Sequence, residues 1–122
     1  MQTESKPAAS QARPGQTSSE TPSPVMEVVR FRAAKGTTDQ QLADAARATD
    51  ALVRAQPGFL ARHLLRDETG GWTDLVLWSG RAEAQAAAAQ VTADPAFGPY
   101  MAAIDVSSVS MAHEAVIWTM TD

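Results

Sequence analysis

The chain has 122 residues, a formal net charge of −4 and no cysteine. This length favours one domain, the lack of cysteine excludes disulfides and thiolate metal sites, and the acidic balance argues against a nucleic-acid-binding surface. The first 24 residues are rich in Ser, Thr and Pro and have no large apolar side chain besides Met1. We therefore expect a disordered tail at 1–24 and a folded domain at 25–122. No apolar run fits a membrane span or a secretory signal, which predicts a cytoplasmic protein.

The first predicted elements are a strand and a helix. Residues 25–33 are rich in β-branched side chains, which is typical of a strand. By alternation, one face of this strand carries Val25, Glu27, Val29 and Phe31. Thr38 and Gln41 have the spacing of a capping box, so a helix should begin after Thr38. Apolar residues at helical spacing continue this helix up to Pro57-Gly58, which ends it.

A β-hairpin is predicted next. Residues 59–68 and 72–79 read as strands on either side of Thr69-Gly70-Gly71, where glycine permits the positive φ of a tight turn. One face of the second strand carries Trp72, Asp74, Val76 and Trp78. A register that aligns Arg66 with Asp74 also puts Arg62 opposite Trp78, which predicts an ion pair and a cation–π contact. A slip by one residue would exchange the two faces.

A second helix and a last strand complete the chain. Residues 81–93 are dominated by alanine, the best helix former, and the helix should open at Ser79 or Gly80. Asp94-Pro95 fits an N-cap followed by the first helical position, so a short helical piece should restart there. That piece contains Phe97, Tyr100, Met101 and Ile104 at helical spacing. We expect residues 105–120 to form the last strand.

The order β-α-β-β-α-β predicts an α+β, ferredoxin-like fold. Right-handed crossovers place both helices on one face of a four-stranded antiparallel sheet of order 4-1-3-2. The other face would carry paired Trp or Leu side chains from at least two strands, an apolar surface of the kind that marks interfaces. We therefore expect a homodimer in which two sheets pack face to face.

Three stretches resemble a known superfamily: VVRFRAAKG, QPGFLARHLLRDETGGWTDLVLWSGRAEAQAA and ADPAFGPYMAAID. They resemble the dimeric α+β barrel superfamily and, within it, the antibiotic biosynthesis monooxygenase-like (ABM-like) domains, over nearly all of 25–122. The resemblance implies a small cofactor-independent monooxygenase acting on an aromatic or polyketide-type substrate. Members that oxidise anthrones have a tryptophan near the cavity, matched here by Trp72 or Trp78, and an asparagine, which this chain lacks. Plant-type cyclases of this fold have a histidine where this chain has Phe97.

The candidate site residues come mainly from the hairpin. His63 is a candidate general base because imidazole titrates near neutral pH. Asp74 shares its face with tryptophans, so its carboxyl group must either be paired or have a raised pKa. Arg62 or Arg66 would stabilise a phenolate or an enolate. The predicted catalytic residues are His63, Asp74, Arg62 and Arg66, and the predicted substrate-binding residues are Trp72, Trp78, Leu64, Val76, Tyr100 and Phe97.

Other residues give weaker signals. His113 and Glu114 are adjacent in the last strand, so they point to opposite faces and cannot form a pair on one side. The two histidines lack a metal-ligand spacing, and no metal or other cofactor is expected. Trp118 is expected to pack on the partner subunit of the dimer. A polyketide cyclase or isomerase, which needs a base but no oxygen, and a non-catalytic small-ligand-binding dimer remain alternative functions; neither nucleic acid nor membrane is an expected partner.

Overall fold

A computed structural model describes residues 23–122. The predicted tail at 1–24 therefore lies almost wholly outside the described residues. The elements are β1 (Val25–Ala33), α1 (Asp39–Arg47), α2 (Asp50–Arg54), β2 (Phe59–Arg66), β3 (Gly71–Trp78), α3 (Arg81–Ala93), the 3₁₀ turn η1 (Pro95–Phe97), α4 (Gly98–Ala102) and β4 (Ile104–Ala115). This is the predicted β-α-β-β-α-β order, with the first helical region divided into α1 and α2 and the second into α3, η1 and α4.

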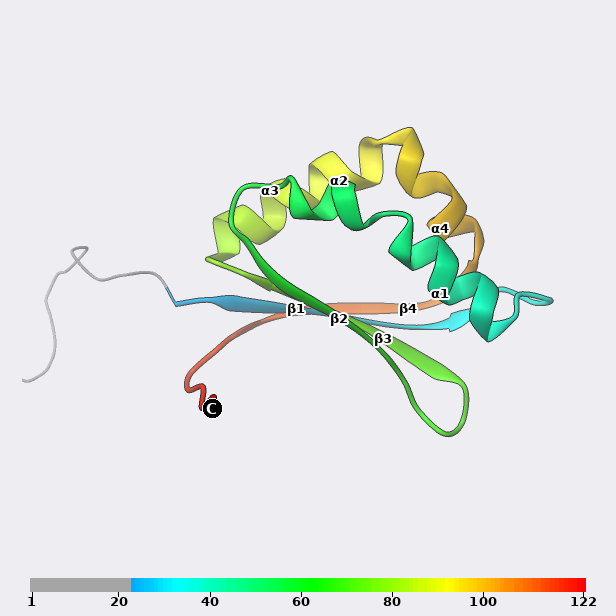
Figure 1. Ribbon diagram of the computed structural model, residues 1–122, viewed down its shortest axis with the longest axis horizontal. Coiled ribbons are helices and arrows are strands. Elements are labelled where there is room, and N and C mark those ends of the chain that lie inside the picture. Colours follow the sequence, from blue (N-terminus) through cyan, green and yellow to red (C-terminus); the bar gives the residue numbers. More distant parts are fainter. Residues whose placement is uncertain (1–22) are drawn as a thin grey trace, which may run out of the picture.

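The four strands form one antiparallel sheet in the order β2-β3-β1-β4. This is the predicted order 4-1-3-2 counted from the opposite edge. All helices cover one face of the sheet and leave the other face open (Figure 1). The α+β, ferredoxin-like fold is thus confirmed.

The capping box at the start of α1 is present. The Thr38 hydroxyl accepts a hydrogen bond from the Gln41 amide at 3.1 Å, and Gln41 Oε1 accepts one from the Thr38 amide at 2.9 Å. The single helix predicted up to Pro57 is wrong, because the chain leaves the helix between α1 and α2. There the buried Thr49 hydroxyl donates to the carbonyl of Ala46 at 2.6 Å, which competes with the regular helical pattern.

Replacing Thr38 with alanine is expected to lower the free energy of unfolding by about 1 kcal/mol, since one amide at the helix start loses its acceptor. Urea unfolding of both proteins measures the difference. Thr37→Ala is the matched control, because no side-chain hydrogen bond of Thr37 occurs among the described residues. Equal losses in the two variants would show that the cap contributes nothing specific.

The register of the β2–β3 hairpin differs from the predicted one by two residues. Arg66 lies opposite Trp72, and Arg62 lies opposite Val76. The reason is Asp67, whose Oδ1 accepts hydrogen bonds from the amides of Thr69 and Gly71 at 2.8 and 2.9 Å and so closes the turn earlier than expected. A two-residue shift preserves the faces, so the predicted face of β3 is the buried one, but the predicted partners of both arginines are wrong.

The restart after α3 follows the prediction, whereas the end of the chain does not. Asp94 Oδ1 accepts from the Ala96 amide at 2.9 Å and Pro95 follows it, as expected of an N-cap. Ile104 already belongs to β4, and β4 ends at Ala115 instead of near residue 120. Its partner strand β1 begins at Val25, opposite Ala115, so within residues 23–122 only Pro24 continues the pairing, by accepting a hydrogen bond from the Val116 amide at 2.8 Å.

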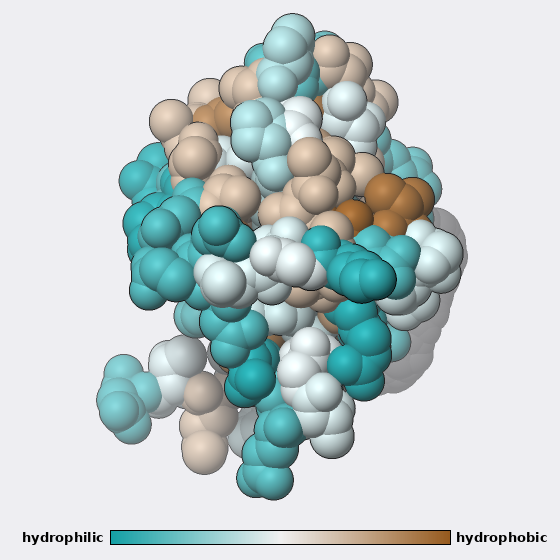
Figure 2. All heavy atoms as spheres, turned by 90° about the vertical axis from the view of Figure 1, so that its right-hand side faces the viewer, coloured by the Kyte–Doolittle hydropathy of each residue, from teal (hydrophilic) through white to brown (hydrophobic). Residues whose placement is uncertain are grey.

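The core lies between the sheet and the helices. It comprises two clusters, which include Phe31, Leu42, Trp72 and Tyr100 in one and Val25, Val53, Trp78 and Ala84 in the other. Both tryptophans of β3 therefore face the helices, and the open face carries leucines but not these tryptophans. At the end of the molecule where the hairpin projects, hydrophilic side chains cover most of the lower part (Figure 2). Among the described residues, no helix combines the length and the apolar character that a membrane crossing requires.

Candidate functional site

A cavity of about 180 Å³ lies between the helix layer and the sheet; we call it the inner cavity. Its wall is mostly apolar and aromatic, and includes Val29, Phe31, Val76, Trp78, Phe97 and Tyr100. Three charged side chains also line it: Glu27 from β1, Arg62 from β2 and Asp74 from β3. A concave apolar space with a few polar groups is the usual form of a small-molecule site.

Asp74 is held by three hydrogen bonds. Arg62 donates from Nε to Oδ1 at 3.1 Å and from Nη2 to Oδ2 at 2.9 Å, and the Tyr100 hydroxyl donates to Oδ2 at 2.9 Å. The guanidinium also lies 5.7 Å from the centre of the Tyr100 ring. Asp74 thus has the cationic partner that its buried position requires, and that partner is Arg62 rather than Arg66.

The same contacts fix the protonation of Arg62 and Tyr100. Burial lowers the pKa of Arg62, but the hydrogen bond to Asp74 and its charge raise it by more, so the guanidinium stays charged. Burial, together with the Asp74 carboxylate, raises the pKa of the Tyr100 hydroxyl far above its ordinary value. Tyr100 therefore serves as a hydrogen-bond donor and not as an acid.

Glu27 is the second carboxyl group of the inner cavity. Trp78 Nε1 donates to its Oε1 at 3.0 Å. Its Oε2 lies 3.8 Å from Nε2 of His113, which is directly opposite on β4 and whose Nε2 is buried without a hydrogen-bond partner. Burial raises the pKa of the Glu27 carboxyl, and the bond from Trp78 offsets only part of this effect. Because its pKa is raised, the Glu27 carboxylate binds a proton more tightly than an exposed carboxylate and is therefore a better base.

Glu27→Gln is expected to change how stability depends on pH. A carboxyl whose pKa is raised by folding binds its proton more tightly in the folded chain, so the wild type loses stability as pH rises from the unfolded value of about 4.5 through the folded one. Glutamine does not titrate, so the variant lacks this loss. Urea unfolding from below pH 4.5 to neutral pH should show a difference that grows in favour of the variant.

His113, Asp74 and Arg62 face Glu27 in both proteins, so the comparison isolates the Glu27 carboxyl. Glutamine also keeps an oxygen that can accept from Trp78 Nε1. Parallel pH profiles would contradict a raised pKa.

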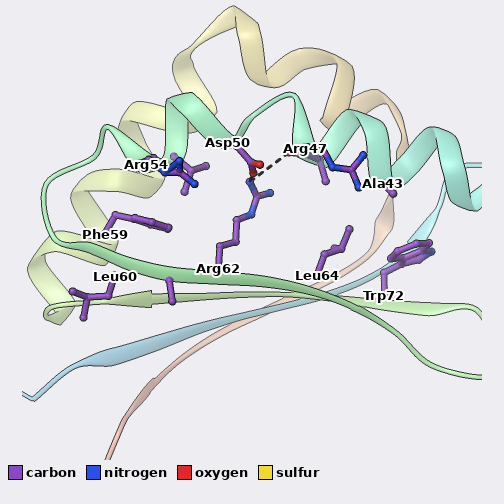
Figure 3. Close-up of a pocket in the computed structure, with 12 residues that line it drawn as sticks. Ala43, Arg47, Asp50, Arg54, Phe59, Leu60, Arg62, Leu64 and Trp72 are labelled. Carbon is purple, nitrogen blue, oxygen red and sulfur yellow. Dashed lines mark hydrogen bonds and ion pairs between the residues drawn. The ribbon is translucent and has the colours of Figure 1, made fainter. Parts of the chain in front are cut away.

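A second, wider space of about 580 Å³ lies between α1, α2 and the edge strand β2; we call it the outer cleft. Arg62 rises from β2 across this cleft, and its Nη1 lies 3.4 Å from Asp50 Oδ1 (Figure 3). Phe59 and Leu60 lie on one side of Arg62, and Leu64 and Trp72 lie on the other. Arg62 and Val53 line both the outer cleft and the inner cavity.

The structure brings most of the predicted site residues together, in two places. Those at the inner cavity are Asp74, Arg62, Trp78, Val76, Tyr100 and Phe97, and those at the outer cleft are Leu64 and Trp72. His63 is exposed and lies opposite Leu75, on the face of the sheet away from the helices. Arg66 is paired with Asp39 of α1 at 2.9 Å and lines neither space.

Sequence reasoning missed the pair of Glu27 and His113. His113 was weighed only against its neighbour Glu114, whereas its partner comes from β1 across the sheet. The available signal was Glu27 itself, an acidic residue on the same face of a strand as Val25, Val29 and Phe31. A carboxyl on such a face needs either a partner or a function.

Solved structures of other proteins have the same fold as this chain. No family model and no curated protein matches the chain. A solved structure of a variant of SnoaB, a cofactor-independent oxygenase from Streptomyces nogalater, has a TM-score of 0.62 and 20% identity, over 82% of this chain and 99% of that one. A candidate antibiotic biosynthesis monooxygenase from Bordetella bronchiseptica has a TM-score of 0.68 and 11% identity, over 79% and 99%.

The chain has the ABM-like fold. Rv0793 from Mycobacterium tuberculosis has it as well, with a TM-score of 0.61 and 17% identity over 81% of this chain and 100% of that one. The resemblance of the sequence to ABM-like domains is thereby confirmed for the fold. Function has to be argued from the site, because one fold hosts many activities.

Proposed function

We propose that this ABM-like chain is a small cofactor-independent oxygenase of an electron-rich aromatic or polyketide-type compound, and that the inner cavity is its active site. The observation that carries the proposal is Glu27: a buried carboxyl with a raised pKa, on the wall of a mostly apolar cavity. A base in such a place can take a proton from a bound phenol. That the similar SnoaB is named a cofactor-independent oxygenase supports the same reaction class.

In the proposed reaction, Glu27 takes the proton of the substrate hydroxyl and leaves a phenolate. The electron-rich ring carbon para to that oxygen forms a C–O bond with molecular oxygen. The resulting peroxide anion receives the proton back from Glu27, and the hydroperoxide then loses water to leave a quinone. One oxygen atom thus enters the product and the other leaves as water, while the substrate supplies the two electrons that reduce it.

The other polar residues have supporting roles in this proposal. Once Glu27 has taken the proton it is neutral, so the phenolate does not face a charged Glu27, and Arg62 is the one cation on the wall of the inner cavity within residues 23–122. Asp74 and Tyr100 hold its side chain in place. Trp78 orients Glu27 through the bond to Oε1, and its ring forms part of the apolar wall.

Oxygen uptake tests the proposal. The wild type should consume oxygen with at least one member of a panel of phenols, naphthols and anthrones whose ring carbon para to the hydroxyl bears hydrogen. Glu27→Gln should lower kcat/KM by about 10²-fold or more, because a positioned base contributes at least that much. Glu68→Gln makes the same chemical change at an exposed position and should have no effect. Absence of uptake across the whole panel would contradict the oxygenase.

Two further comparisons separate the alternatives. If His63→Gln abolishes uptake and Glu27→Gln does not, the base lies on the open face and not in the inner cavity. If product forms equally well without oxygen, the chain is a cyclase or an isomerase. Ligands that bind without turnover under either condition would favour a non-catalytic binding protein.

We also propose that a second copy of the chain covers the open face of the sheet, giving a dimeric α+β barrel. This face presents apolar side chains from three strands: Met26, Val28, Leu65, Leu75 and Leu77. The segment after β4 runs along the same side (Figure 1) and ends in exposed apolar residues, among them Trp118. Light scattering should give twice the chain mass for the wild type and the single mass for Leu75→Asp. A monomeric wild type would overturn this proposal.

A further inference from the structure

Resting on the oxygenase proposal, a narrower inference concerns the ligand. We propose that the inner cavity takes an uncharged compound with a single aromatic ring, whose hydroxyl group donates a hydrogen bond to Glu27 Oε2. Three features of the cavity carry this inference: its unused polar atoms, its charge and its size.

The unused polar atoms are few. Both oxygens of Asp74 accept hydrogen bonds from Arg62 or Tyr100, and Glu27 Oε1 accepts one from Trp78. Within the described part of the chain, Glu27 Oε2 accepts none, and His113 Nε2 lies 3.8 Å from it. A hydrogen-bond donor of a ligand would gain the most binding free energy at this oxygen, because it accepts no other hydrogen bond.

The charge of the wall selects against anions. Among residues 23–122, its acidic side chains are Glu27 and Asp74 and its one cation is Arg62, which already makes two hydrogen bonds to Asp74. An anionic ligand would meet the Glu27 carboxyl with no free cation to balance it. An ammonium group would lose its hydration for a single acceptor oxygen in an apolar space. A neutral hydroxyl group can donate to Glu27 Oε2 without the repulsion that an anion would meet and without the loss of hydration that an ammonium group would suffer.

The size of the cavity limits the ligand to one ring. An apolar cavity of about 150 Å³ is enough to bind benzene, and the inner cavity measures about 180 Å³. This is well below the range of about 300–1,000 Å³ found for sites of drug-sized ligands. The aromatic wall also suits a ring: Phe97 and Tyr100 meet edge to face at 5.4 Å between centroids.

Calorimetric titration of the full chain with five probes tests the inference: p-cresol, toluene, 4-methylbenzoate, anthrone and benzylamine. We expect p-cresol to bind about tenfold more tightly than toluene, because it adds one hydrogen bond to a charged acceptor. We expect no measurable binding of 4-methylbenzoate or anthrone. Benzylamine, as a cationic probe, should bind more weakly than p-cresol.

Variants then locate the contact. Glu27→Gln should reduce p-cresol binding about tenfold and leave toluene binding unchanged, whereas Glu68→Gln should change neither. Equal binding of p-cresol and toluene to the wild type would overturn the inference without any variant, and so would tighter binding of 4-methylbenzoate, anthrone or benzylamine.

These outcomes are distinct from those of the oxygenase test. If p-cresol binds as expected and no compound supports oxygen uptake, the ligand class stands and the oxygenase fails. If uptake occurs with anthrone and p-cresol does not bind, the oxygenase stands and the one-ring ligand fails.

Discussion

Asp74→Ala is expected to lower the free energy of unfolding by about 3–5 kcal/mol, the cost of removing one partner from a buried ion pair. Arg62 would keep a charged guanidinium whose side chain is only 10% exposed, with its strongest acceptor gone. Tyr100 would lose the acceptor of its hydroxyl at the same time. Urea unfolding with far-UV circular dichroism measures the loss.

Two comparisons show whether the buried pair is the cause. Asp50→Ala removes the half-exposed acidic partner of Arg62 and should cost at most about 1 kcal/mol. The double variant Arg62→Met with Asp74→Leu removes both charges and should recover much of the loss, because well-packed apolar residues often replace a buried pair at little cost. A loss below about 1 kcal/mol in Asp74→Ala would mean that water reaches the guanidinium.

Trp78→Ala is expected to cost about 3–5 kcal/mol, the usual range for truncation of a large aromatic side chain in a core. Trp78 is 2% exposed, and its ring meets Phe59 edge to face at 6.0 Å. Its loss would also enlarge the inner cavity, so larger rings should bind to the variant. Urea unfolding and titration with anthrone measure the two effects.

Trp78→Phe is the matched comparison for the hydrogen bond. Phenylalanine keeps most of the buried ring but cannot donate to Glu27 Oε1, so a smaller loss of about 1–3 kcal/mol is expected. Because the bond from Trp78 lowers the pKa of Glu27, its removal should raise that pKa further. An unchanged pH dependence of stability in Trp78→Phe would contradict the contact between the two residues.

Much of the fold could be predicted from local patterns. The capping box at Thr38, the alternation of β3 and the pair Asp94-Pro95 each depend on residues that are close together in the sequence. The hairpin register was missed because it depends on which side chain closes the turn. Asp67 does so through three hydrogen bonds from Thr69 and Gly71, a detail that alternation does not contain.

The site was predicted in part. Arg62 and His63 are neighbours in a strand, so only one of them can face the helices, and the sequence alone does not show which. The structure places Arg62 in the inner cavity and His63 on the open face. The pair of Glu27 and His113 depends on the register between β1 and β4, which are far apart in the sequence, so no local pattern reveals it.

The two carboxyl groups of the inner cavity stand on the central strands, whereas the arginine and the histidine beside them stand on the edge strands. Glu27 and Asp74 belong to β1 and β3, each hydrogen-bonded on both sides, while Arg62 and His113 belong to the edge strands β2 and β4. Edge strands tolerate substitution and movement more readily than central ones. Substitutions at Arg62 or His113 on the edge strands can therefore change the pKa values of the carboxyl groups. The positions of Glu27 and Asp74 on the central strands would stay the same.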